Sequence, residues 1–495
     1  MILGSDQLWK ILTGEKIQLK NQTLTALNSS FGWVITGSVS KSGVSKSRVG
    51  RCRLPGSLLE MDSLQSSKSK ITDHDPVEKY FSSTVQRAEN GTYVVKYQFK
   101  ADIKPIDDTL PQAISRLNSM DAKLQRQLAL KQQYTAFLNE YLELGHMELI
   151  PEQQINVSTS KRFYLAHHPV IKADSSTTKC RVVFDGSLKD FSGYSLNDRL
   201  QIGPPIQRDL FGVFLRFRQH RYVFATNIEK MFRVKRVHPE QTDYQRSVLR
   251  HEQTAKLQHY RLLTVTYGLA PSPFLAVRVL KQIAEDYKAE YPNASGVLEH
   301  DAYVDDIPTG CDTVEDLIAL KNELIELLSK ANFNLRKWSS NCWHLLETLP
   351  KAICEFIPIA IHSQTSETSV KILGLHWNPS SDELFLNIGD PVIEPKPTKR
   401  MVFSETSKIY DPLGMVAPIV VLFKVLFQES WCYGLDWDDP LPEALCKRWC
   451  NYMGELHHLK QLQIHFISFK ACGTSWIFRC INRGMRGCCI LSRAH

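Results

Sequence analysis

Hydrophobic side chains recur at steps of three and four residues between Pro111 and Gly145. The repeating positions are Ile114, Leu117, Leu124, Leu128, Tyr134, Phe137, Leu138, Tyr141 and Leu142. This spacing places apolar side chains on one face of a helix, and it predicts two amphipathic helices. Gly145 is a suitable end for the second helix, because glycine readily adopts the left-handed conformation that follows many helices.

The pattern changes at several points along the rest of the chain. Residues 1–40 contain short β-type runs between turn residues, which indicates a small β domain. Residues 40–69 are rich in Ser, Lys, Arg and Gly, a composition typical of a linker. Short strands and helices alternate from Pro151 to about residue 390, which predicts an α/β body, and a mostly helical region is predicted from Pro395 onward.

Composition narrows the class of protein. The 495 residues are 43% hydrophobic, which is enough for more than one core and favours roughly three domains. A formal charge of +8 weakly favours a polyanionic partner. The 12 cysteines lack the spacing of a zinc site, and no apolar run resembles a signal peptide or membrane span. We therefore expect reduced thiols and a cytosolic or nuclear protein.

Asp305 and Asp306 are the sharpest candidate for chemistry. They follow the β-type residues Ala302–Val304, and adjacent carboxylates at a hairpin tip do not suit a hydrophobic core. Because the two charges repel each other, a divalent cation is the simplest partner that makes their proximity favourable. A solvated acidic turn is an equally good interpretation of these residues alone.

A second segment suggests what the carboxylates could do. Nucleotide addition by a polymerase uses two Mg²⁺ ions about 4 Å apart, and therefore needs a further carboxylate on a neighbouring strand. The expected place is Phe224–Arg233, where a β-type run leads directly into a short predicted helix. The residue at the end of that run is Asn227 instead of an aspartate.

Six segments occur in the order that is typical of retroelement reverse transcriptases: Lys179–Ser187, the residues around Asn227, Tyr267–Phe274, Tyr303–Asp306, Phe333–Trp338 and Leu373–Trp377. Their amino-acid sequences resemble those of the BEL/Pao-type LTR retrotransposons, and the similarity extends from residue 1 to about residue 463. The resemblance implies a Pol polyprotein fragment of the α/β (α+β) class, with the right-hand reverse transcriptase fold of fingers, palm and thumb.

The resemblance also assigns roles to individual residues. It makes Asp305, Asp306 and Asn227 (in place of Asp) the catalytic set, with Asp305 and Asp306 as ligands for Mg²⁺ or Mn²⁺. Arg181 would grip the incoming triphosphate, a task suited to a planar guanidinium. Phe232 would select deoxynucleotides by blocking a ribose 2′-hydroxyl. A surface arginine and a core phenylalanine are the alternative interpretations.

Two further groups match positions that contact template and primer. Gly268, Pro271 and Ser272 correspond to the loop and helix start under the templating base, where small residues permit close approach of the backbone. Gly374, His376 and Trp377 correspond to a hairpin that holds the primer end. A plain turn and a buried tryptophan explain the same two groups.

Asn227 is the most consequential difference from the family pattern, which has aspartate at this position. Asparagine lacks the negative charge that balances two cations, and loss of one preorganised electrostatic stabiliser typically lowers a rate by about 10² to 10³. Glu229 is not a replacement, because the family carries an acidic residue at that position as well. We therefore expect this copy to be impaired.

The resemblance divides the chain into seven parts: a C-terminal remnant of a retropepsin-like aspartic protease (1–40), a linker (41–75), a helical segment leading into the fingers (76–150), fingers and palm (151–345), a primer-grip hairpin with the start of the thumb (346–395), a connection region (396–465) and a divergent tail (466–495). No Asp-Thr-Gly or Asp-Ser-Gly triplet occurs, so peptidase activity is not expected. No Asp or Glu follows Glu455, which suggests that a frameshift has replaced an RNase H domain.

Two functions follow from these observations. The first is an RNA-directed DNA polymerase that takes an RNA template, a DNA primer and dNTPs, in a cytoplasmic virus-like particle or the nucleus, together with other Pol or Gag products. The second is a catalytically inactive nucleic-acid-binding protein that grips nucleic acid through basic and aromatic residues. The sequence leaves the oligomeric state open and predicts no membrane association.

Overall fold

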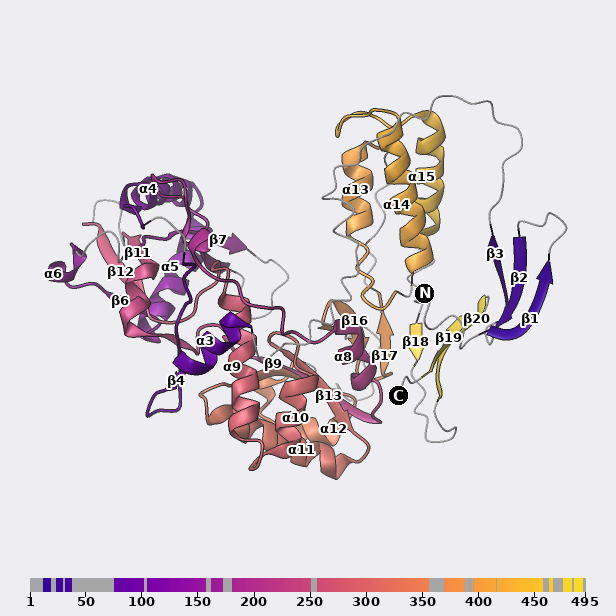
Figure 1. Cartoon of the computed structure of the whole chain (residues 1–495), viewed down its shortest axis with the longest axis horizontal. Coiled ribbons are helices and arrows are strands. Elements are labelled where there is room, and N and C mark those ends of the chain that lie inside the picture. Colours follow the sequence, from indigo (N-terminus) through magenta and orange to yellow (C-terminus); the bar gives the residue numbers. More distant parts are fainter. Residues whose placement is uncertain are drawn as a thin grey trace. The chain divides into compact units, whose positions relative to one another are not determined.

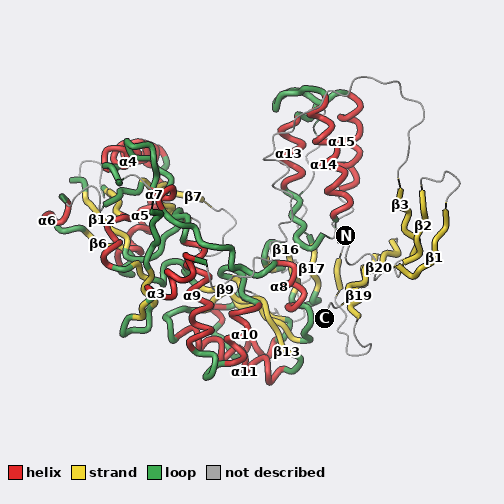
Figure 2. Tube along the Cα trace, viewed as in Figure 1, coloured by secondary structure: helices red, strands yellow, loops and turns green. Residues whose placement is uncertain are grey.

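The chain divides into two compact units in the computed structural model. One unit is Lys68–Gln364, and the other combines Met1–Ser67 with Thr365–His495. The structure describes residues 75–101, 105–156, 162–171, 180–250, 256–355, 369–386, 389, 394, 396–414 and 416–456, and six terminal segments as backbone strands. Apart from Asp75, the predicted linker at 41–75 lies outside the described residues, as does the predicted junction near residue 466. The chain mixes helices and strands, in agreement with the predicted α/β (α+β) class (Figure 2).

The two helices predicted between Pro111 and Gly145 are present. They are α4 (Leu110–Arg126) and α5 (Leu128–Glu143), and their apolar faces are buried. Gly145 has a φ of +63°, and two backbone hydrogen bonds close the end of α5: Gly145 N to Leu142 O (2.9 Å) and His146 N to Tyr141 O (2.8 Å). This is a Schellman ending, so the predicted role of Gly145 is confirmed.

The 68–364 unit contains a three-stranded antiparallel sheet, which we call the central sheet. Its order is β13 (Asp306–Cys311), β9 (Tyr222–Ile228) and β14 (Leu335–Ser340), with β9 in the middle. Nearby lie α8 (Leu210–Phe217), α9 (Ser272–Asp286), α10 (Pro292–His300), α11 (Val314–Ser329) and α12 (Trp343–Glu347) (Figure 1). The rings of Phe224 and Trp338, both fully buried, are 5.2 Å apart and join β9 to β14.

Smaller sheets and short helices complete this unit. The sheets are β11 (Arg246–Leu249) with β12 (Gln258–Leu262) and β6 (Met147–Leu149), β7 (Ala166–Ile171) with β8 (Cys180–Asp185), and β10 (Arg236–Val237) with β5 (Tyr93–Val95) and β4 (Gln86–Arg87). The helices are α3 (Pro76–Thr84), α6 (Glu152–Ile155), α7 (Leu196–Arg199), η2 (Pro239–Gln245) and η3 (Lys351–Ile353).

Two local predictions around the central sheet are wrong. The strand β13 begins at Asp306, the second of the paired carboxylates, and of the β-type residues before the pair only Tyr303 forms a bridge, to Asp306. Residues 229–234, where a short helix was predicted, form consecutive turns, and Lys230 has a φ of +52°. Lys230 and Arg233 both pair with Glu140 of α5, at 2.6 Å and 3.2 Å. These contacts from a distant helix override the local preference for a helix.

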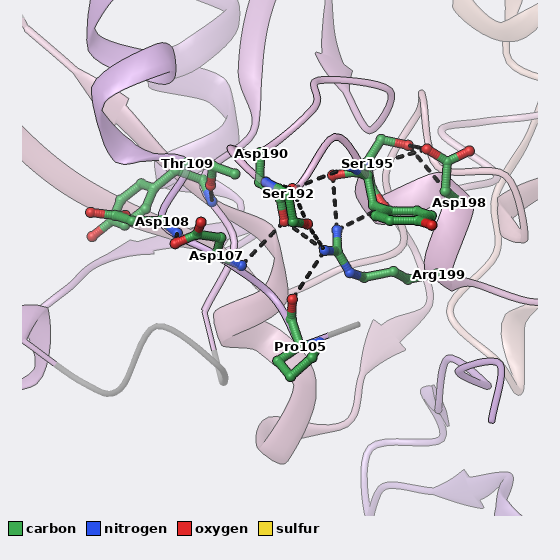
Figure 3. A network of polar contacts seen from close by, with 11 residues as sticks. Pro105, Asp107, Asp108, Thr109, Asp190, Ser192, Ser195, Asp198 and Arg199 are labelled. Carbon is green, nitrogen blue, oxygen red and sulfur yellow. Dashed lines mark hydrogen bonds and ion pairs between the residues drawn. The ribbon is translucent and has the colours of Figure 1, made fainter. Parts of the chain in front are cut away.

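A buried ion pair fixes the loop before α7 (Figure 3). Arg199 and Asp190 are 2.6 Å apart and almost fully buried. Asp190 also accepts from the backbone N–H of Ser192 (3.0 Å) and of Asp107 (3.2 Å), while Arg199 donates to the Pro105 carbonyl (3.2 Å). Both members of the ion pair have further hydrogen-bond partners, so this network ties Pro105 and Asp107 to the loop at 190–199.

The other unit contains helices and two sheets. Its helices α13 (Lys399–Ser407), α14 (Ala417–Cys432) and α15 (Glu443–Glu455) run side by side (Figure 1). Its six-stranded sheet runs β15 (Val370–Ile372), β16 (Leu375–Asn378), β17 (Glu383–Phe385), β18 (Gln463–His465), β19 (Ser475–Asn482) and β20 (Met485–Ser492). A separate sheet contains β1 (Leu12–Gln18), β2 (Leu24–Ser29) and β3 (Gly32–Gly37), where a β domain was predicted. Among the described residues, no helix is long and apolar enough to cross a membrane.

Candidate active site

Asn227 lies beside both aspartates of the candidate pair. Asn227 is directly opposite Asp306 in the register of β9 and β13. Its side-chain Nδ2 donates to Asp305 Oδ2 and to Asp306 Oδ1, and both distances are 3.0 Å. The structure therefore brings together the three residues that the sequence grouped, and it places an amide nitrogen where the two carboxylates converge.

The carboxylates are held by a tight two-residue turn. Tyr303 N donates to Asp306 O (2.8 Å), and Asp306 N donates to Tyr303 O (3.0 Å). Val304, the first central residue of the turn, has a φ of +52°. A β-branched side chain strongly disfavours that conformation, so surrounding contacts must hold the turn in place. Ile228 N supplies one such contact by donating to Asp305 O (2.7 Å).

The environment disfavours a charge on Asp306. Burial and the neighbouring charge of Asp305 raise the pKa of Asp306 to about 6, although the Asn227 hydrogen bond and Lys337 act in the opposite direction. Lys337 is a residue of the site that the sequence analysis did not predict. It lies in Phe333–Trp338, a matched segment to which no role was assigned, and its φ of +58° marks an irregular point in β14. The basic residues of that segment were the sequence feature that could have identified Lys337.

Glu229 is engaged elsewhere. Its Oε2 lies 2.9 Å from Arg336 Nε, and its backbone N–H donates to Asn334 O (2.8 Å). Arg336 faces Asn227 across the β9 and β14 pair, so this ion pair closes the opposite side of β9 from Asp306. The geometry agrees with the expectation that Glu229 does not replace an aspartate at position 227.

The present donor set does not fit a pair of divalent cations. Two carboxylate oxygens converge within 3.0 Å of one point, as hard ligands for Mg²⁺ would, but an N–H₂ donor occupies that point. A cation there would repel the amide hydrogens and would lack the third negative charge. Among the described residues, no group of three or more His, Cys, Asp and Glu side chains could hold a metal ion.

Arg181 and Phe232 lie around a common neighbour, Tyr267. The rings of Phe232 and Tyr267 are 4.9 Å apart. Burial raises the pKa of Tyr267, which also senses the charges of Arg233, Arg181 and Asp305. Arg181 is half-buried on β8, and Phe232 is half-buried in the turns after β9. Phe232 thus packs against Tyr267, whose pKa both Arg181 and Asp305 influence, and the predicted roles of Arg181 and Phe232 stay predictions.

The loop with Gly268 is packed too tightly for any side chain. Gly268 has a φ of +98°, and a Cβ there would lie 1.9 Å from the Phe184 carbonyl oxygen. Asn197 holds the loop by donating to Gly268 O (3.0 Å) and accepting from Ala270 N (2.8 Å). These contacts explain why glycine stands at this position.

Pro271 and Ser272 lie at the start of a helix. Pro271 is the N-cap of α9, and Ser272 is its first residue. Ser272 donates from its Oγ to Thr266 O (2.7 Å) and is buried. The predicted loop and helix start are present, whereas contact with a template remains a prediction.

Gly374, His376 and Trp377 belong to the other unit. They form a hairpin of β15 and β16 around Leu373 and Gly374, which both have positive φ. Trp377 is fully buried, and its Nε1 donates to Asp382 Oδ1 (2.9 Å). Burial lowers the pKa of His376, whose Nδ1 lies 3.0 Å from Ser369 Oγ. The hairpin is present, and a role in holding a primer remains a prediction.

Comparison with known families bears on the unit that carries α13–α15. Residues 398–472 match the family model described as the Pao retrotransposon-like RNaseH-like domain. The matched range overlaps the predicted connection region and extends past residue 465 into the predicted tail. No curated protein matches the chain. The match supports a Pao-type retrotransposon Pol polyprotein as the origin of this chain.

Proposed function

We propose that residues 151–345, within the 68–364 unit, are the fingers and palm of a retrotransposon reverse transcriptase, in which Asn227 has impaired nucleotide addition. One observation carries the proposal: Asn227 on the central strand contacts both Asp305 and Asp306 at the tip of the adjacent strand. An aspartate at position 227 would complete a cluster of three carboxylates, which is the donor chemistry that a polymerase cation pair requires.

The surroundings of the cluster support the same assignment. Arg181 provides a guanidinium suited to a triphosphate, and Phe232 packs against Tyr267 at the border of the site. The Gly268 loop packs against Phe184 of β8, the strand that also carries Arg181. The family match at residues 398–472 adds that a retroelement Pol is the parent protein.

The impairment follows from the donor set. The Asn227 amide offsets part of the mutual repulsion of the aspartates through hydrogen bonds, but it carries no charge and cannot balance two divalent cations. Loss of one preorganised electrostatic group lowers a rate by about 10² to 10³, and we expect at least that loss here.

A second function, binding of primer and template without chemistry, is favoured by the same contact. The amide gives each carboxylate a hydrogen-bond donor without a cation, and the formal charge of +8 suits a nucleic-acid partner. Binding of this kind would weaken steeply with increasing salt, as phosphate contacts release counterions.

Primer extension on an RNA template, with Mg²⁺ or Mn²⁺, tests the proposal. The native chain is compared with Asn227→Asp, and Asn227→Asp/Asp305→Asn serves as a control that again removes one carboxylate. We expect extension by Asn227→Asp at a rate at least about 10²-fold above that of the other two.

The other outcomes are informative in different ways. Equal extension by the native chain would contradict the impairment. Absence of extension by every variant, with salt-sensitive binding of a labelled primer–template retained, would favour the second function. Absence of both extension and binding would reject the proposal.

A further inference from the structure

The strained turn that carries the aspartates is gripped from outside the central sheet. Gln207 accepts from Val304 N through its Oε1 (3.1 Å) and donates to Ala302 O through its Nε2 (2.9 Å). Ala302 O and Val304 N are the two groups that a neighbouring strand would bind along an extended edge. The side chain of Gln207 therefore substitutes for a missing strand at one point.

The segment with Gln207 is itself firmly placed. Lys281 of α9 donates to Ile206 O (2.8 Å), and Arg208 donates from its Nε to Glu299 O (3.2 Å) at the end of α10. Ile206 is buried. Gln207 is thus fixed on both sides by anchored neighbours, so that its amide is preorganised against the turn.

Further contacts hold the chain between α10 and the turn. Arg216 of α8 donates to Asp301 Oδ1 (2.7 Å), and Thr309 of β13 donates to Asp301 Oδ2 (2.8 Å). Asp301, two residues before Tyr303, is therefore held by both α8 and β13. Between them, Val304 has a φ of +52°, a conformation that persists only when its surroundings determine it.

We infer that Gln207 is a positioning residue that sets the geometry of Asp305 and Asp306 by clamping the backbone of their turn. The inference rests on the proposed function. Gln207 does not touch the carboxylates, and it acts through the peptide groups on the N-terminal side of Asp305. A displacement of about 1 Å at a reacting site can lower a rate by about 10²-fold, so loss of this clamp has a measurable consequence.

The chain offers a matched control. Gln241 makes the same two-point contact with one residue elsewhere: Tyr97 N donates to its Oε1 (2.6 Å), and its Nε2 donates to Tyr97 O (2.9 Å). Truncation of Gln241 removes an equivalent backbone clamp without touching the turn at 303–306.

Two measurements test the inference on Gln207→Ala, Gln207→Glu and Gln241→Ala. The first is residue-level amide exchange at Val304 in the native chain. We expect roughly tenfold faster exchange in Gln207→Ala, an intermediate increase in Gln207→Glu, which keeps the acceptor for Val304 N but loses the donor to Ala302 O, and no change in Gln241→Ala. Equal exchange in Gln207→Ala and Gln241→Ala would overturn the inference.

The second measurement is single-nucleotide addition in the Asn227→Asp background. We expect Gln207→Ala to lower kcat by about 10- to 100-fold with unchanged Kd for primer–template, and Gln207→Glu to recover part of the loss. An unchanged kcat in Gln207→Ala would contradict a positioning role. If Asn227→Asp itself adds no nucleotide, the proposed function fails, and exchange at Val304 alone decides the inference.

Discussion

Replacement of Asn227 by aspartate is expected to loosen the central sheet when divalent cations are absent. The native amide donates two hydrogen bonds of 3.0 Å to carboxylates. A hydrogen bond to a charged group contributes about 1.5–3 kcal/mol, and two of them at a half-buried site contribute about 2–4 kcal/mol. The aspartate removes both bonds and adds a third negative charge.

The repulsion added by the new charge is limited by protonation. Two charges about 4 Å apart at an effective dielectric constant of 20 repel by about 4 kcal/mol. Burial and Asp305 already raise the pKa of Asp306 to about 6, so the cluster can relieve part of this repulsion by taking up a proton. We therefore expect a net loss of at least about 3 kcal/mol at pH 7.5, which corresponds to at least roughly 10²-fold faster local opening.

Amide exchange measured by mass spectrometry on fragments covering β9 and β13 checks this expectation in EDTA and in excess Mg²⁺. Ile228 N, which donates to Asp305 O, is the most direct reporter. Asn341→Asp is a matched control, because Asn341 Oδ1 accepts from Val223 N on the same sheet and an aspartate keeps that acceptor. Mg²⁺ at about 100 times its Kd would stabilise the folded Asn227→Asp variant by about 2.7 kcal/mol, and would therefore slow its exchange again. Unchanged exchange of Asn227→Asp in EDTA would refute the reasoning.

Two further variants test the packing and the buried charge. Gly268→Ala should destabilise the 68–364 unit by more than about 2 kcal/mol, because its Cβ would overlap the Phe184 carbonyl, whereas Gly296→Ala, whose Cβ meets nothing within 4 Å, should be neutral or slightly stabilising in thermal unfolding. Burial lowers the pKa of Lys235 from 10.5 to about 7, so the folded chain binds fewer protons than the unfolded chain between those values, and stability should rise with pH across that window by up to about 1.4 kcal/mol per pH unit. Lys235→Met should abolish that rise in urea unfolding measured from pH 7 to pH 10, and an unchanged pH dependence would show that Lys235 is not its source.

The features that sequence predicted well are those with local causes. The periodic apolar positions of α4 and α5 and the ending at Gly145 depend on residues close in sequence, so the pattern alone located them. The resemblance to reverse transcriptases brought Asn227, Asp305 and Asp306 together, and the register of β9 and β13 agrees with that grouping.

The features that sequence missed have distant causes. The turns after Asn227 replace a predicted helix because Lys230 and Arg233 pair with Glu140 of α5. The clamp by Gln207 joins residues 97 positions apart, and no short motif encodes it. The orientation of the Asn227 amide toward both carboxylates depends on side-chain geometry that a sequence pattern does not specify.

Counting bound Mn²⁺ by electron paramagnetic resonance tests the central claim most directly, namely that the Asn227 amide stands where a cation would bind. The native chain, Asn227→Asp and Asn227→Asp/Asp306→Asn are titrated in the absence of nucleic acid. We predict a tight Mn²⁺ site in Asn227→Asp that is absent from the native chain and weakened by the second substitution. Equal numbers of Mn²⁺ ions bound with equal affinity by the native chain and by Asn227→Asp would contradict the account.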